Sequence, residues 1–409
     1  MAFQAIFRWR LVRARGLKLN RIADSGQGEG APEGRWACVD AFRGLAIAGM
    51  VVVNNPGSWD HVYPPLLHAP WHGCTFTDLV FPWFLFVAGT SMAFSLDGAR
   101  GRGIPRKSLM ARAARRAFVL FLLGLLLNGS SLFLDWMLNG AVFDAGNLRI
   151  MGVLQRIGGA YALAAAMAIY LPRGGQWLTG GLLLVAHWAA MTLIPVPGFG
   201  AGDLSPQGNA AAWVDRLLLS PSHLYLGGPY DPEGLLGTFP AAVTVLAGYW
   251  AGEFMGGQPV RSRTSLEMLL AGANGIMAGT FWGMAFPVNK ALWTGSYVVL
   301  TAGWSLVLLA VLYEIMEARG WKRWARPLEI AGLNAIFLFV ASGLVGRVLY
   351  RVRMSSLPEA PSLYRWLFET FFLPWGEPVD ASLAFALTTL LLWWLMLYAL
   401  YRRRVFFKV

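Results

Sequence analysis

The sequence predicts an all-α fold, a polytopic integral membrane helix bundle with about ten transmembrane helices and both termini in the cytoplasm. Of its 409 residues, 56% are hydrophobic and only 14% are charged, and the mean hydropathy is +0.50. Soluble domains are typically about 45–50% apolar and about 25% charged. The apolar excess is spread along the chain in repeated runs, and basic residues cluster in alternate loops. These observations indicate a membrane protein.

Each predicted span is an apolar run close to the roughly 20 residues that a helix needs to cross a bilayer. We interpret the spans as helices because backbone in lipid must satisfy its own hydrogen bonds. Residues 1–36 are expected to form a basic cytoplasmic tail and linker, and residues 37–409 one transmembrane domain. The ten segments are 39–55, 78–96, 116–134, 150–171, 177–195, 235–255, 266–286, 297–316, 328–346 and 381–401.

The distribution of basic residues sets the orientation. Of 34 Lys and Arg residues, 25 fall in the tail, the C-terminal end and the loops on one side of this arrangement. The positive-inside rule places that side in the cytoplasm. The net charge of +12 therefore reflects topology. We expect membrane lipid, and no nucleic acid, as a partner.

One outward loop, residues 54–83, has an unusual composition. It holds three of the five histidines, His61, His68 and His72, and it contains no Lys or Arg. A metal site is not expected, because Pro70 interrupts any regular helix between His68 and His72 and no His-Glu-x-x-His pattern occurs. We expect no bound metal as a cofactor.

His68 lies between an amide at the end of one span, Asn54, and a carboxylate at the start of the next, Asp78. A base, an amide donor and an orienting carboxylate are the groups that acyl transfer uses. Asp78 also fits a second interpretation, as an acid at a helix N-terminus, where the helix dipole favours negative charge.

Ionisable and amide side chains inside or beside the spans are costly in lipid, so each is expected to pair with a neighbour or to face a ligand. Asp40 and Arg43 lie three residues apart on one helix face and fit either interpretation. Arg149 and Arg156 are seven apart and can hold a polyanion or pair with acids. The candidate cofactor contacts are Asp40, Arg43, Arg149, Gln155, Arg156, Asn289, Lys290 and Asn334.

Several motifs, in order, resemble the heparan-α-glucosaminide N-acetyltransferase family. They are VDAFRGLAIAGMVVVNN, HAPWHGCTFTDLVFPWFLFVAGTSM, LRIMGVLQRIGGAY, AAWVDRLLL, YDPEGLLGT and FPVNKALWTGSYV. The resemblance implies transfer of acetyl from cytosolic acetyl-CoA, as co-substrate, to the amine of glucosamine or a terminal glucosaminide across the membrane. It also implies a homodimer. The large N-terminal domain of the animal enzymes has no counterpart here, which implies a bacterial inner-membrane member whose His68 loop faces the periplasm.

The resemblance also implies roles for individual residues. The family's essential histidine corresponds to His68 in HAPWHG, which departs from the family motif at Pro70 and His72. Its asparagine corresponds to Asn54, although a longer loop leaves Asn55 as an alternative. Trp71, Asp231 and Glu233 are candidate contacts for the acceptor sugar, and the two acids also fit a structural cap at a helix start.

Two other functions remain open at this point. Ten spans with buried charges also describe a sugar transporter, although no inverted repeat is visible in the sequence. An O-acyltransferase of a surface polysaccharide also uses a histidine. Release of free thiol from acetyl-CoA in the presence of an amino sugar separates these alternatives.

Overall fold

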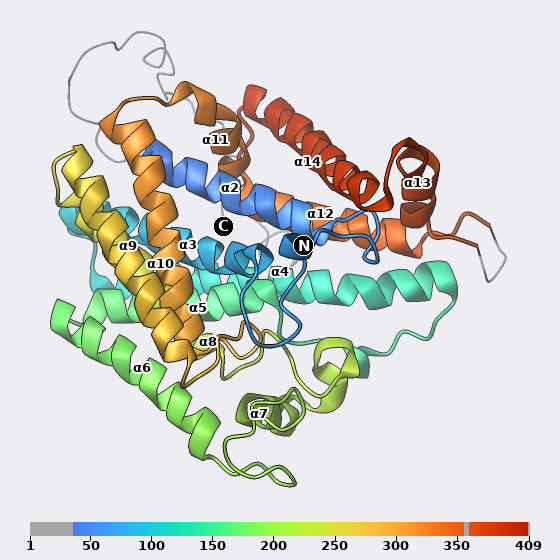
Figure 1. The fold of residues 1–409 in the computed structure, drawn as a ribbon, viewed down its shortest axis with the longest axis horizontal. Coiled ribbons are helices and arrows are strands. Elements are labelled where there is room, and N and C mark those ends of the chain that lie inside the picture. The colour runs from blue at the N-terminus through green and yellow to red at the C-terminus, as the bar shows by residue number, and fades with distance from the viewer. Residues whose placement is uncertain (1–35, 356–359, 408–409) are drawn as a thin grey trace, which may run out of the picture.

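The computed structural model describes residues 36–355 and 360–407, and within them the chain is built from helices, with no β-strand. Residues 1–35 of the predicted tail lie outside the described residues. The helices, labelled as in Figure 1, are α2 (Ala37–Asn54), α3 (Phe76–Gly101), α4 (Arg106–Asn139), α5 (Val153–Tyr170), α6 (Arg173–Leu193), α7 (Ala210–Leu219), α8 (Thr238–Gly256), α9 (Ser262–Gly283), α10 (Gly295–Tyr313), α11 (Arg326–Leu333), α12 (Ala335–Arg351), α13 (Leu363–Phe371) and α14 (Pro378–Arg402).

Nine of the ten predicted spans each coincide with one helix, the tenth, 328–346, covers two, and the all-α prediction is confirmed for the described residues. Six described helices are long and apolar enough to cross a membrane, namely α2, α3, α4, α5, α14 and α10 with its π-helical extension to Ala318. A seventh span results if the residues from Arg323 through α11 and α12 count as one segment bent by 66°. The chain is thus a multi-pass membrane protein, and ten spans stay a prediction.

The predicted span 328–346 is two helices in the structure. The break falls at Asn334, whose side-chain amide donates to the Val405 carbonyl at 3.2 Å and accepts from the Phe407 amide at 2.9 Å. Asn334 is buried and ties the C-terminal segment to the bend. Both polar atoms of its side-chain amide therefore have backbone partners. Its contact with a cofactor stays a prediction.

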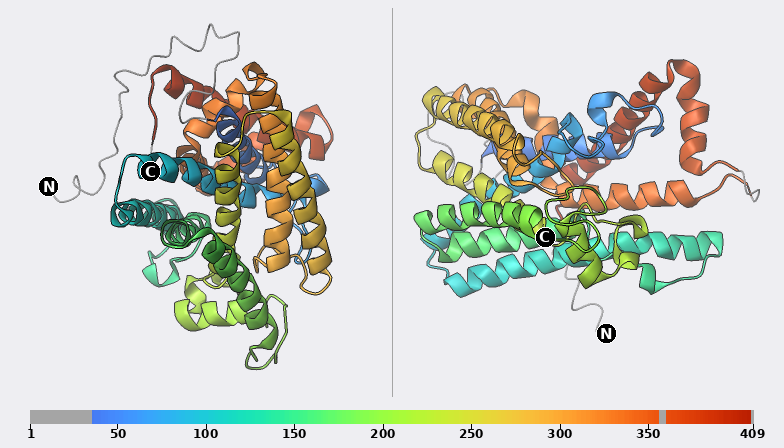
Figure 2. Two further views of the ribbon diagram at one scale, coloured as in Figure 1. Left: turned by 90° about the vertical axis from the view of Figure 1, so that its left-hand side faces the viewer. Right: turned by 60° about the horizontal axis from the view of Figure 1, so that its bottom comes forward.

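The helices pack closely where glycines face a neighbour. A Cβ added to Gly89 on α3 would lie 1.8 Å from the Val245 carbonyl oxygen on α8, and one on Gly248 would lie 1.9 Å from the Phe86 carbonyl oxygen. Small residues that let backbones approach are typical of membrane helix contacts. The pairs α3/α8, α4/α5 and α9/α10 run side by side on this basis (Figure 1, Figure 2).

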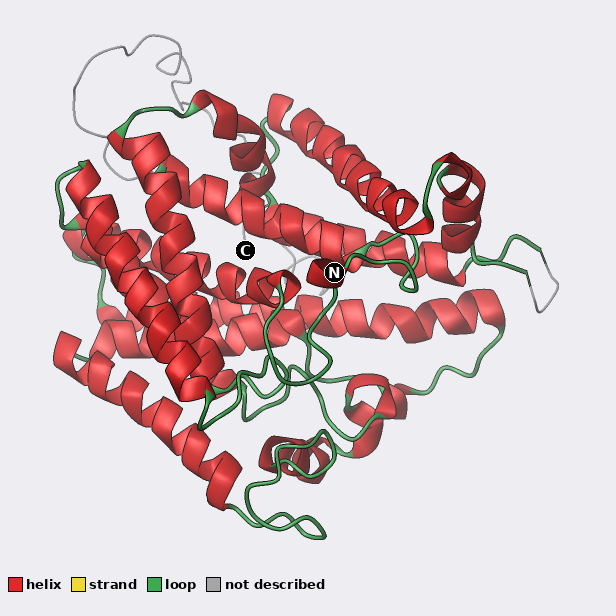
Figure 3. Ribbon diagram, in the orientation of Figure 1, coloured by secondary structure: helices red, strands yellow, loops and turns green. Residues whose placement is uncertain are grey.

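Loops predicted to lie on the same side of the membrane meet at one end of the bundle. Trp71 donates to the Leu204 carbonyl at 2.8 Å, and the Gly73 amide donates to the Val288 carbonyl at 2.8 Å. At the other end, the Cys38 amide donates to Glu317 at 3.1 Å. Figure 3 shows loops gathered at the ends of the long helices. This arrangement agrees with the alternation derived from the basic residues.

The short helix α7, which is not among the predicted spans, supports the outer loop 231–235. Its Asp215 is buried and accepts from the Leu235 amide at 2.8 Å. Gly234 packs directly on this carboxylate, since an added Cβ would lie 1.8 Å from Asp215 Oδ2. Burial raises the pKa of Asp215 to about 6. The folded protein therefore binds a proton at Asp215 more tightly than the unfolded chain does.

We expect Asp215→Asn to stabilise the protein at neutral pH. The raised pKa contributes stability that is complete below the unfolded value of about 3.9 and is lost as the pH rises through about 6. The amide keeps an oxygen for Leu235 and removes the buried charge, for a gain of up to about 3 kcal/mol at pH 7. Thermal unfolding of the detergent-solubilised variant between pH 4 and 8 measures this.

The exposed Asp97 provides the matched control, because Asp97→Asn removes a carboxylate that is not buried. Because this carboxylate is exposed, we expect Asp97→Asn to leave the free energy of unfolding at pH 7 close to the wild-type value. A destabilised Asp215→Asn variant at pH 7, or a gain that persists at pH 4, would contradict this account of Asp215.

Candidate active site

A histidine and a carboxylate meet at the outer end of α3. His68 Nδ1 lies 2.7 Å from Asp78 Oδ1, and the His68 side chain is 50% exposed while that of Asp78 is 1% exposed. The carboxylate accepts a hydrogen bond from the Nδ1–H group. Nε2 is then the ring nitrogen with a free electron pair. The structure thus holds an accessible imidazole in the orientation of a general base.

Asp78 also organises the loop that carries the histidine. Its second oxygen, Oδ2, accepts from the Thr75 amide at 3.0 Å, the Thr75 hydroxyl at 3.1 Å and the Ala69 amide at 3.0 Å. Thr75 and Asp78 form a capping box at the start of α3. Both interpretations of Asp78 therefore hold at once, since one carboxylate caps the helix and contacts His68.

Lys290 completes the cluster from a loop 222 positions further along the chain. Its Nζ lies 3.1 Å from His68 Nδ1, 3.2 Å from His68 Nε2 and 3.7 Å from Asp78 Oδ1, and its side chain is 22% exposed. Burial lowers the pKa of Lys290 from its ordinary value, while the negative charges of Asp78 and Glu233 oppose that shift. An amine of reduced basicity therefore contacts the imidazole.

The neighbouring Asn289 holds this loop against the histidine segment. It is fully buried, and its amide donates to the Trp71 carbonyl at 2.9 Å and lies 3.3 Å from His72 Nδ1. Its oxygen accepts from the Leu292 amide at 2.9 Å. Asn289 therefore positions Lys290 and Trp71, and its predicted contact with a cofactor stays a prediction.

Trp71 lies between the histidine segment and the outer cap. Its indole N–H is used by the Leu204 carbonyl, and its ring meets Tyr230 edge to face with 5.0 Å between centroids. Tyr230 directly precedes Asp231. This places the predicted acceptor contacts Trp71 and Asp231 on adjoining segments, beside the His68 cluster.

The two candidate asparagines differ in their surroundings. Asn54 is the last residue of α2 and is exposed. Asn55 donates to the Val51 carbonyl at 2.7 Å, and its oxygen lies 3.8 Å from where a Cβ on Gly346 would be. Asn55 is thus committed to packing between α2 and α12, which favours Asn54 as the amide available to a ligand.

The predicted anion and sugar contacts of the outer cap pair with each other. Arg149 donates to both oxygens of Asp231, at 2.8 and 2.6 Å, and to Glu233 at 2.5 Å. Arg156 is buried, donates to the Pro232 carbonyl at 2.9 Å and the Gly234 carbonyl at 3.0 Å, and lies over the Trp293 ring. Of the two interpretations of these arginines, pairing with acids and backbone groups agrees with this arrangement, and holding a polyanion stays a prediction.

The remaining candidate cofactor contacts do not join the His68 cluster. Asp40 and Arg43 pair with each other at 3.0 Å near the opposite end of α2, and Arg43 also donates to Ser91 at 2.5 Å. Gln155 donates to the Ile150 carbonyl at 2.9 Å. Of the eight residues, only Lys290 reaches His68, so a shared cofactor role for the set stays a prediction.

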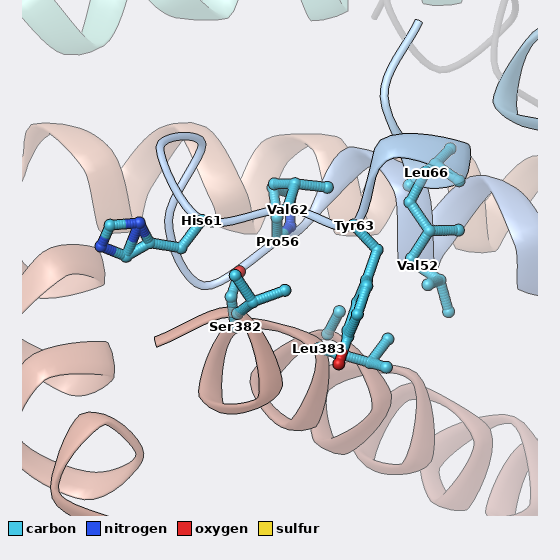
Figure 4. Close-up of a pocket in the computed structure, with 11 residues that line it drawn as sticks. Val52, Pro56, His61, Val62, Tyr63, Leu66, Ser382 and Leu383 are labelled. Carbon is cyan, nitrogen blue, oxygen red and sulfur yellow. The ribbon is translucent and has the colours of Figure 1, made fainter. Parts of the chain in front are cut away.

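Of the other two loop histidines, His72 lies 3.3 Å from the Asn289 amide, next to Lys290, whereas His61 lies on a segment held by α14. The segment after α2 is fixed to α14, because the Ser58 amide donates to Ser382 at 3.1 Å and Tyr63 bonds Asp380. Figure 4 shows Tyr63 lying beside Leu383 and the His61 ring pointing away from both. Within residues 36–355 and 360–407, no three His, Cys, Asp or Glu side chains are grouped to hold a metal ion.

The contact between Lys290 and His68 and the position of Tyr297 were not predicted from the sequence. The Tyr297 hydroxyl donates to the Asp78 carbonyl at 2.6 Å and so ties α10 to the start of α3. Both residues belong to the stretch FPVNKALWTGSYV, a motif of the family resemblance in which Lys290 was predicted as a cofactor contact and Tyr297 had no predicted role. No spacing signal could have linked positions more than two hundred residues apart.

Comparison with known proteins agrees with these motifs. The family model described as heparan-α-glucosaminide N-acetyltransferase, catalytic, matches residues 35–279. Human and mouse heparan-α-glucosaminide N-acetyltransferase are each 29% identical to this chain over 427 aligned positions. The alignments cover 92% of this chain and 60% of each relative, so the chain spans about 60% of the length of the curated relatives it matches.

The matched region contains both partners of the central contact, His68 and Asp78, and both acids of the outer cap, Asp231 and Glu233. It extends over more than half of the 409 residues. The chain belongs to the family of heparan-α-glucosaminide N-acetyltransferase catalytic domains.

Proposed function

We propose that the protein transfers an acetyl group from acetyl-CoA to the amine of glucosamine or of a terminal glucosaminide, with His68 as general base. The observation that carries the proposal is the 2.7 Å contact between His68 Nδ1 and buried Asp78 on an exposed imidazole. The family membership supports acetyl-CoA as the co-substrate.

In the proposed reaction the acceptor presents a neutral amine, and an acceptor that arrives as an ammonium first loses a proton to water. The amine nitrogen attacks the thioester carbonyl and gives a proton to His68 Nε2. The C–N bond forms and the C–S bond breaks, and the sulfur leaves with its electron pair as a thiolate that takes this proton. Asp78 stabilises the transient imidazolium, as a carboxylate on Nδ1 does in hydrolase triads.

The position of Lys290 Nζ leaves the lone pair of Nε2 accessible. Nζ lies 3.1 Å from Nδ1 and 3.2 Å from Nε2 of His68, so it is over the ring and outside the in-plane direction of that lone pair. An acceptor amine can therefore come within hydrogen-bond distance of Nε2. In the proposed complex the Lys290 amine, beside this place, contacts the thioester oxygen or a phosphate of acetyl-CoA.

Asn54 is the proposed donor to the negative oxygen that develops on the thioester carbonyl. The proposed contacts of the sugar are Trp71, Asp231 and Glu233. The two acids are proposed to contact it while they remain paired with Arg149. We favour direct transfer over an acetyl-histidine intermediate, because an N-acylimidazole facing water would hydrolyse easily.

The charge pattern supports a location of this site on the outer, periplasmic face of a bacterial inner membrane, with acetyl-CoA supplied from the cytosol. A homodimer, implied by the family resemblance, completes the proposal. The proposed partners are acetyl-CoA, the amino sugar and membrane lipid. The orientation in the membrane can be measured by labelling, in intact cells, a cysteine introduced in the loop 54–75.

His68→Ala should abolish acetyl transfer, with thiol release reduced by about 10²–10⁴-fold, because proton transfer is lost. The assay combines purified protein, acetyl-CoA and glucosamine and follows free thiol, while isothermal titration confirms that acetyl-CoA still binds. His61→Ala is the matched control and should retain activity, since His61 lies on the segment that Ser58 and Tyr63 fix to α14.

Several outcomes of this assay would contradict the proposal. Full activity in His68→Ala rejects the base. Radioactive acetyl trapped on wild-type protein without acceptor rejects direct transfer. Sugar uptake into vesicles without thiol release favours a transporter, and release with hydroxyl acceptors alone favours O-acylation.

Asn54→Ala should lower kcat by about 10²–10³-fold, the usual effect of removing one oxyanion donor. Asn55→Ala is the matched control and should leave kcat near the wild-type value. It should lower thermal stability by about 1 kcal/mol, since it removes one hydrogen bond to Val51. The reverse pattern of kcat values would assign the role to Asn55 instead.

Lys290→Gln separates a role at the reacting atoms from simple cofactor binding. If the lysine assists transfer, kcat falls and Lys290→Arg, which keeps the charge, restores part of it. If Lys290 only binds a phosphate, the KM for acetyl-CoA rises and kcat is unchanged. The contact with His68 predicts the first result, and steady-state kinetics with both substrates decide.

A further inference from the structure

A second polar cavity lies at the opposite end of the bundle from His68. Its volume is about 620 Å³, and it forms where α3 and α5 end and α4 and α6 begin, against α8. Arg100 in its wall is 22 residues along α3 from Asp78, a distance of about 33 Å at the rise of an α-helix. The two sites are therefore separate.

Three arginines and one acid line this cavity, namely Arg100, Arg106, Arg173 and Glu253. Arg100 donates to the Tyr249 hydroxyl at 3.3 Å and to the Ala168 carbonyl at 2.6 Å. Tyr249 donates to Glu253 at 2.5 Å, and Arg173 pairs with the other oxygen of Glu253. These contacts fix the floor of the cavity and neutralise one of its three positive charges.

Of the two arginines that Glu253 does not neutralise, Arg100 donates to Tyr249 and to the Ala168 carbonyl, and Arg106 is the one whose guanidinium remains available. Among the residues that the structure describes, it makes no ion pair and no side-chain hydrogen bond. It is the first residue of α4, a helix of 34 residues whose first turn has amide groups without helical acceptors. A helix N-terminus favours an anion, and here it adjoins a guanidinium and a preformed cavity.

Aromatic side chains beside the cavity mark the level of lipid headgroups. Tyr170, in the lining, is 47% exposed, and the exposed Trp177 stacks on Trp250 with 3.6 Å between ring centroids. Tyr and Trp are enriched at membrane interfaces. The loop between α3 and α4 is also among the most basic of the chain, which places the cavity on the predicted cytoplasmic side.

We propose that this cavity binds a phosphate group at the cytoplasmic membrane surface, and that an anionic phospholipid headgroup supplies it. Arginines suit phosphate because their planar donors match its oxygens. Basic pockets between helices on the cytoplasmic side recognise such headgroups. The phosphates of acetyl-CoA share this chemistry, so the experiment compares the two sources.

The test uses the purified full chain with Arg106→Gln and with Arg106→Gln/Arg173→Gln. Native mass spectrometry measures the affinity for phosphatidylglycerol and for phosphatidylcholine of equal acyl composition, and titration measures the affinity for coenzyme A. We expect wild type to prefer phosphatidylglycerol, and each substitution to weaken that binding by about fivefold, since one arginine near anionic lipid contributes about 1 kcal/mol.

Arg112→Gln is the matched control, because Arg112 is exposed on α4 and does not line the cavity. It should leave lipid affinity unchanged. Weakened coenzyme A binding in the variants, with lipid binding unaffected, would keep the phosphate site and change its source. Equal binding of both lipids, together with coenzyme A affinity that no variant changes, would overturn the proposal.

The readout is independent of acetyl transfer. A protein that fails to acetylate glucosamine but binds phosphatidylglycerol through Arg106 retains this site. If the enzyme is active but its affinities for lipid and for coenzyme A do not depend on Arg106, the phosphate site is absent. The proposed function and the phosphate site can thus fail separately.

Discussion

The outer face depends on one buried carboxylate, that of Asp78. Its two oxygens receive the His68 ring, the Ala69 and Thr75 amides and the Thr75 hydroxyl. A buried charge without such partners would cost several kcal/mol, so the loop can fold only by supplying them. The same requirement that caps α3 therefore fixes the histidine, and the site geometry follows from the stability of the helix start.

A second set of buried charges shapes the neighbouring cap. Arg149 and Arg156 hold the segment 231–235 through Asp231 and the Gly234 carbonyl, and Asp215 holds it through the Leu235 amide. Gly237 leaves room for this packing, since a Cβ there would lie 2.6 Å from Arg156 Nη2. The arginines, which the sequence allowed as ligands for a polyanion, stabilise the cap that stands beside Lys290.

Local chemistry was predictable and distant pairing was not. Apolar runs marked the helices, and Asp78 was predicted as an acid at a helix N-terminus close to His68. Hydropathy could not reveal the break at Asn334, because it depends on the backbone near Val405. Nor could it show the short helices α7 and α13. The contact between Lys290 and His68 comes from the packing of α10 against α3, which no local pattern encodes.

Lys290 and an acceptor amine meet His68 from different directions. Nζ lies 3.1 and 3.2 Å from the two ring nitrogens, which places it over the imidazole, whereas an acceptor amine must approach Nε2 along the in-plane lone pair. A sugar can therefore bind at Nε2 while the lysine stays in place. Lys290 Nζ also lies 3.7 Å from Asp78 Oδ1, so the carboxylate that stabilises the imidazolium of the proposed reaction is also the nearest negative charge to the lysine.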